Sequence, residues 1–118
     1  MILIGKGGKP VLNKLNQVTA YIEENLTEEL SVEIIAQTVE IPAFHLRQLF
    51  FYLAGMTLSE YIKKRRLAAA NEDLLNGERV TDIAFKYGYQ SLDGFTRAFK
   101  KWSGYLPSEV MKTGLIKS

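Results

Sequence analysis

The sequence predicts an all-α protein of seven helices, in which two helix-turn-helix units are joined by a long connecting helix. Apolar residues recur at three- and four-residue spacing, which is the period of helices with one buried face. A helix, a tight turn and a second helix are indicated over residues 79–107, and a similar pattern lies about 48 residues earlier. The chain has 118 residues, which suits one domain or two very small ones.

The stretch from residue 79 to 107 shows the pattern most clearly. Gly88 is suited to end the first helix with positive φ, and Ser91 is suited to cap the second. The second helix has an apolar stripe and a polar, basic opposite face. Its stripe is Phe95, Ala98, Phe99 and Trp102. This stretch alone leaves open whether it is a DNA-binding motif or an ordinary amphipathic hairpin with a solvated basic face.

A second copy of the helix-turn-helix pattern favours a DNA-binding motif over an ordinary amphipathic hairpin. Val32, Ile35 and Ala36 match Val80, Ile83 and Ala84 at a shift of 48, and Phe50, Gly55, Ser59 and Glu60 match Phe99, Gly104, Ser108 and Glu109 at a shift of 49. The extra residue falls in the turn or the start of the second helix, where an insertion disturbs packing least. The matches lie on the face that each unit is expected to bury.

The remaining elements follow from capping residues and breakers. We expect helices over residues 12–24, from a Ser31 cap to 39, over 42–53, over 58–75 and over 107–112. Thr57 and Glu60 form a capping box before the long helix. The predicted organisation is an irregular segment (1–10), a first helix-turn-helix subdomain (11–54), a connecting helix (55–77), a second subdomain (78–113) and a tail (114–118).

Composition argues against several other classes. The chain has no cysteine and one histidine, so we expect no disulfide, metal site or cofactor, and an enzyme is a distant third hypothesis. No secretory signal or membrane-length apolar run is visible, and we expect a cytoplasmic protein. Residues 1–60 hold 4 basic and 7 acidic side chains, whereas residues 61–118 hold 11 and 6, which would orient the protein on a polyanion.

The second helix of each unit carries side chains suited to base edges. An arginine can hold guanine with two hydrogen bonds and a glutamine can hold adenine, which singles out Arg47, Gln48 and Arg97. Phe44 points outward, where it either meets a thymine methyl or packs on a neighbouring helix. We expect phosphate contacts from His45, Lys86, Lys100 and Lys101. The run Lys63 to Arg66 is either solvated or partly in contact with phosphate.

The doubled unit, the long connecting helix and the run IAFKYGY…FTRAFKKWSGYLP resemble the DNA-binding domain of the AraC/XylS family of bacterial transcription regulators. The resemblance covers about residues 12 to 112. It implies seven helices and sequence-specific binding to two successive major grooves of double-stranded DNA. The positions that match the base-contacting residues of the family are Phe44, Arg47, Gln48, Leu92, Asp93, Thr96 and Arg97.

The chain departs from the family pattern at both units. Pro42 replaces a Ser or Thr cap, Glu40 replaces a small turn residue, and Leu106 replaces the cap before Pro107. Leu92 and Asp93 have no donor of base-edge length, so specificity through the second unit would depend mainly on Arg97.

The resemblance also bears on partners. We expect RNA polymerase as a partner and no membrane. We also expect the isolated domain to be a monomer, because two reading helices lie in one chain. The effector domain that many family members carry is absent from this chain. The chain either acts alone or is a fragment, and its abrupt ending at residues 114–118 favours a fragment. The competing hypothesis is a helical protein-interaction module whose basic face meets an acidic partner.

Overall fold

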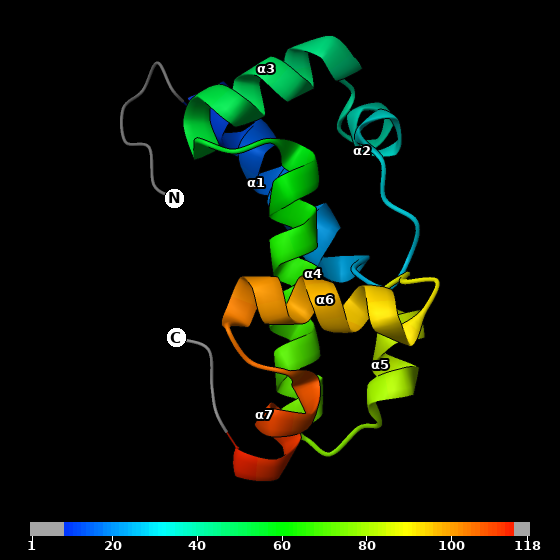
Figure 1. Cartoon of the computed structure of the whole chain (residues 1–118). Coiled ribbons are helices and arrows are strands. Elements are labelled where there is room, and N and C mark those ends of the chain that lie inside the picture. The colour runs from blue at the N-terminus through cyan, green and yellow to red at the C-terminus, as the bar shows by residue number, and fades with distance from the viewer. Residues whose placement is uncertain (1–8, 115–118) are drawn as a thin grey trace. The chain divides into compact units, whose positions relative to one another are not determined.

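The computed structural model describes residues 9–114, and within that range the chain forms seven helices and no strand (Figure 1). The helices are α1 (Lys9–Glu24), α2 (Val32–Val39), α3 (Ala43–Ala54), α4 (Leu58–Leu75), α5 (Val80–Lys86), α6 (Leu92–Ser103) and α7 (Pro107–Thr113). The all-α fold of seven helices is therefore confirmed. The segment predicted to be irregular and the predicted tail fall mostly outside the described residues. The prediction was wrong at Lys9 and Pro10, which are already helical because proline suits a first helical turn.

The chain divides into two compact units whose boundary lies within α4, between Ile62 and Lys63. We call residues up to Ile62 the first unit and those from Lys63 the second unit. Each unit therefore contains one helix-turn-helix pair, α2 with α3 and α5 with α6, together with part of the long helix.

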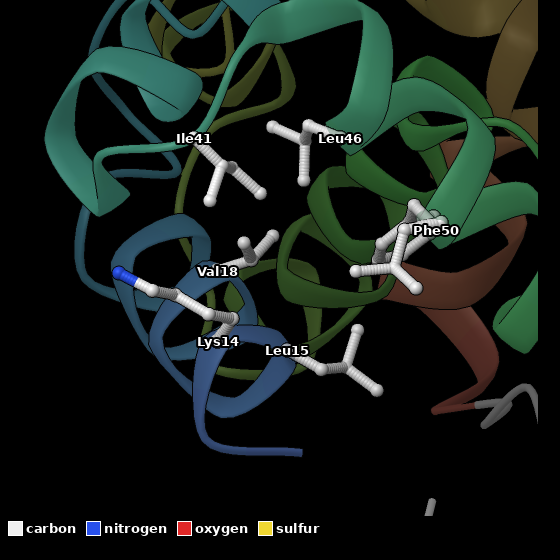
Figure 2. A pocket seen from close by; sticks show the side chains of 7 residues that line it. Lys14, Leu15, Val18, Ile41, Leu46 and Phe50 are labelled. Carbon is white, nitrogen blue, oxygen red and sulfur yellow. The ribbon is translucent and has the colours of Figure 1, made fainter. Parts of the chain in front are cut away.

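The first unit packs α3 onto α1 and α2 through a core of aliphatic and aromatic side chains. Its deeply buried members include Val18, Ile22, Ile35, Leu46 and Phe50. Figure 2 shows the apolar cavity left between α1 and α3, which has a volume of about 10 Å³ and is too small to hold more than one water. The amino group of Lys14 points away from these apolar side chains and donates to the backbone carbonyl of Val39. The cavity is a packing defect and no ligand site.

Two predicted helix starts in the first unit are confirmed. The Ser31 hydroxyl accepts from the backbone N–H of Ile34 at 3.1 Å, which satisfies one of the unpaired donors of α2. Thr57 and Glu60 form the predicted capping box, because each side chain accepts from the backbone N–H of the other residue. Both α2 and α4 therefore begin where the sequence indicates.

The second unit packs α5, α6 and α7 around the later part of α4. Its core side chains include Leu67, Leu74, Ile83, Phe95, Phe99 and Val110, all buried. Ser91 caps α6 by accepting from Gly94 at 3.0 Å, as predicted. Before α7, where Leu106 offers no capping oxygen, the Glu109 carboxylate accepts from the Leu106 backbone N–H at 2.7 Å. The family cap that is missing at Leu106 is thus partly replaced.

A polar cluster ties α5 to α4 inside the second unit. The Tyr87 hydroxyl donates to Asp73 Oδ2 at 2.6 Å, and Lys86 Nζ lies 2.8 Å from the same oxygen and 3.0 Å from Glu78 Oε1. Burial and the bond to Asp73 raise the pKa of the Tyr87 phenol well above its usual range. The hydrogen bond to Asp73 likewise raises the pKa of Lys86.

The internal repeat is visible in the element boundaries. Helices α3 and α6 both have 12 residues, and each start and end is displaced by 49 positions. The preceding turns match at a shift of 48, since Glu40 and Gly88 both adopt positive φ and the next residues, Ile41 and Tyr89, donate to Ala36 and Ala84. The extra residue in the second unit is therefore Gln90, within the turn. This confirms where the sequence placed the change of shift.

Candidate nucleic-acid interface

Helix α3 carries Phe44, Arg47 and Gln48 on one exposed face in its first two turns. Their spacing of three and four residues places them side by side along the helix, while Leu46 and Phe50 hold the opposite face in the core. The side chain of Phe44 is 63% exposed, so it does not pack in the core, and its ring centroid lies 5.9 Å from that of His45. An exposed aromatic, a five-donor cation and an amide are thus presented together.

Arg47 is paired with a carboxylate from the neighbouring helix. Its Nη2 donates to Glu33 Oε2 at 2.6 Å, and both side chains remain exposed. The bond from Arg47 lowers the pKa of the Glu33 carboxyl. Sequence reasoning did not find this partner, because Glu33 lies 14 residues earlier on α2.

His45 occupies the adjoining face of α3, beside two aromatic residues that the site prediction left out. Gln48, Leu49, Phe51 and Tyr52 line a shallow, open depression with His45. Phe51 is 57% and Tyr52 84% exposed. Phe51 follows Phe44 by seven residues and Tyr52 follows Gln48 by four, and this spacing could have added both to the predicted site. The exposed face of α3 is therefore more aromatic and extends further than the predicted residues Phe44, Arg47 and Gln48.

Helix α6 presents a second set of outward side chains from its first turns. Leu92, Asp93 and Arg97 are exposed, and Thr96 is half-buried. Arg97 Nε lies 3.1 Å from Asp93 Oδ2, one turn earlier on the same helix. The four predicted positions therefore lie on one side of α6, and Arg97 is the only one with a long donor.

The predicted phosphate contacts fall into two groups. Lys100 and Lys101 are exposed in the last turn of α6, where the helix dipole favours cations. Lys86 instead lies between Asp73 and Glu78, and its ammonium is already neutralised within the unit. A contact between Lys86 and phosphate stays a prediction. In the structure, its ammonium group contacts the carboxylates of Asp73 and Glu78.

The four basic residues 63–66 at the start of the second unit differ in their exposure. Lys63 and Lys64 are exposed, while Arg65 and Arg66 are half-buried. Burial lowers the pKa of Arg66, which lies near the Tyr89 phenol. The two lysines are therefore the most exposed cations of this run.

The described residues contain neither a candidate membrane span nor a cluster of metal ligands. Within residues 9–114, no helix combines the length and apolarity that crossing a bilayer requires. In the same part of the chain, no three histidine, cysteine, aspartate or glutamate side chains converge as metal ligands would.

Comparison with known proteins identifies the architecture. A family model described as a helix-turn-helix domain matches residues 35–113. The transcriptional activator AarP of Providencia stuartii is 38% identical over 95 residues, which span 80% of this chain and 70% of AarP. The chain belongs to the AraC/XylS family of helix-turn-helix transcription regulators. Its domain is thus a DNA-binding domain of transcription regulation, as the sequence predicted.

Solved structures agree with this assignment. The AraC-type regulator from Chromobacterium violaceum superimposes with a TM-score of 0.81 at 26% identity, covering 92% of this chain and 95% of that one. The DNA-binding domain of AdpA, solved in complex with a target DNA, gives a TM-score of 0.76 at 22% identity over 84% of this chain and 90% of that one. The second likeness concerns the fold alone.

Proposed function

We propose that this chain regulates transcription by inserting α3 and α6 into two successive major grooves of one duplex. The observation that carries the proposal is the repeat: two 12-residue helices, displaced by 49 positions, each present a long polar side chain from an exposed face. A single α-helix fits the major groove, and two such helices in one chain allow a monomer to cover about 20 base pairs, or two helical turns.

The first unit is proposed to carry most of the sequence discrimination. Arg47 would bond a guanine, Gln48 an adenine, and Phe44 a thymine methyl, which are the base-edge partners that these side chains favour. In the second unit Arg97 would be the main base contact, with Leu92, Asp93 and Thr96 beside it. His45, Lys100 and Lys101 are proposed to bind phosphate. A phosphate contact from Lys86 also stays a prediction, and it would compete with the ion pairs to Asp73 and Glu78.

Further parts of the proposal concern partners and organisation. Residues 11–54 and 78–113 would act as the two DNA-binding subdomains, joined by residues 55–77. A cytoplasmic, non-enzymatic protein that contacts RNA polymerase fits this role, and transcription assays with purified polymerase test the last point. Expressing this chain alone in cells and measuring transcription from the selected site tests whether it needs an effector domain.

The decisive experiment is selection of bound sites from random DNA, followed by titration of the chosen site and a scrambled one. We expect one chain per site and a preference of about a thousandfold or more. The logarithm of affinity should fall linearly with the logarithm of salt concentration, because phosphate contacts release counterions. Failure to enrich any sequence, or two chains on the shortest site, would contradict the proposal. Tight salt-sensitive binding to an acidic protein instead would favour the interaction-module hypothesis.

A further inference from the structure

We infer that Glu33 determines specificity by holding Arg47 in position for base recognition and keeping it away from phosphate. The inference rests on the proposed function and names a residue that contributes without being a base contact itself. Glu33 lies in the first turn of α2, whereas Arg47 lies on the exposed face of α3. The 2.6 Å contact between Oε2 and Nη2 therefore connects the supporting helix to the recognition helix.

The contact leaves Arg47 able to bind a base. A guanidinium has five N–H donors, and the bond to Glu33 uses one of them. The remaining donors include the pair needed to bond guanine O6 and N7. Glu33 can thus hold the side chain before DNA arrives and keep holding it afterwards, so less side-chain freedom is lost on binding.

The Glu33 carboxylate also affects whether Arg47 binds a base or a phosphate. A long, unrestrained arginine near DNA can turn to a phosphate, which gives affinity without sequence preference. The ion pair with Glu33 competes with binding of Arg47 to a phosphate. The negative charge of the Glu33 carboxylate is also repelled by the phosphates. Glu33 should therefore lower affinity for non-specific DNA while favouring the correct base.

The ion pair between Glu33 and Arg47 contributes little to the stability of the fold. Both side chains are more than half exposed, at 53% for Arg47 and 65% for Glu33. Exposed ion pairs contribute little to folding, because water and salt screen them. Replacing Glu33 should consequently leave the fold intact and change only DNA binding.

The test compares Glu33→Gln with Glu29→Gln, a change of equal charge at an exposed residue before α2. Each variant is titrated on the selected site, on its single-base-pair substitutions and on scrambled DNA. With Glu33→Gln we expect the preference at the base pair read by Arg47 to fall about five- to tenfold, part of what one bidentate contact provides. Affinity for scrambled DNA should rise about twofold, as one negative charge is removed. Glu29→Gln should leave every base preference unchanged.

The same substitution in an Arg47→Ala background separates positioning from a direct effect. There Glu33→Gln should no longer change any base preference. An unchanged preference in the single variant, or an equal loss in the Arg47→Ala background, would overturn the inference while wild-type specificity still supports the proposed function. A wild-type chain without any preferred site would refute both.

Discussion

Replacing Tyr87 with phenylalanine removes one oxygen from the cluster that ties α5 to α4. The hydroxyl donates to Asp73 Oδ2 at 2.6 Å, and the Tyr87 side chain is buried. Hydrogen bonds to a charged group contribute about 1.5–3 kcal/mol. Asp73 keeps Lys86 as a partner at 2.8 Å, so no buried charge is left alone and the lower end of that range applies. We expect Tyr87→Phe to destabilise the domain by about 1.5 kcal/mol.

Thermal unfolding measures this difference. For a domain of this size, 1.5 kcal/mol corresponds to a fall in Tm of about 6 °C. Tyr52→Phe is the matched control, because Tyr52 is 84% exposed and its loss of an oxygen should leave Tm unchanged. Equal Tm values for wild type and Tyr87→Phe at neutral pH would refute the reasoning.

The pH dependence gives a second check on the same bond. The phenol pKa of Tyr87 is raised in the folded state, since burial and Asp73 both oppose its ionisation. A raised pKa means that this stabilisation is fully present below the unfolded pKa of about 10 and is lost as pH rises further. The Tm difference between wild type and Tyr87→Phe should therefore be constant from pH 7 to 9 and shrink above pH 10. A difference that grows at high pH would contradict this assignment.

Three further predictions concern the turn and the two recognition helices. Glu40→Gly should stabilise the domain by about 1 kcal/mol, because Glu40 holds φ at 61°, where side chains are strained, while Glu40→Gln should give no gain in Tm. Arg97→Ala should weaken binding to the selected site by about 1–3 kcal/mol and relax the preference at one base pair. Lys100→Ala should instead weaken binding to all sequences alike and make affinity depend less steeply on salt concentration. Neutralising the basic side chains of the second unit should lower affinity for scrambled DNA more than the same treatment of the first, and equal losses in filter binding would refute this difference.

Local signals account for most of what the sequence predicted about the fold. Ser31 and Ser91 cap the helices they precede, since a capping oxygen acts within three residues and its position is visible in the sequence. The repeat placed the extra residue in the turn, where the structure has Gln90. The start of α1 was missed because the glycines and lysines before Pro10 resemble a loop.

The contacts that the sequence could not predict join residues far apart in the chain. Helical spacing did not predict the ion pair between Lys86 and Asp73, because Asp73 lies 13 residues earlier and is brought close only by packing. The partner of Arg47 likewise lies on another helix. Outward positions follow from helical spacing, but the pairing of the exposed charges follows from tertiary structure.

In the proposed function, α3 and α6 of one chain read two separate parts of one site. The measurement that tests it most directly is the affinity of wild type, Arg47→Ala and Arg97→Ala for every single-base-pair substitution of the selected site. Arg47→Ala should flatten the preference in one half of the site and Arg97→Ala in the other, with the two centres about 10 base pairs apart. If both variants changed the same base pair, or neither changed any preference, the two helices would not be reading successive grooves.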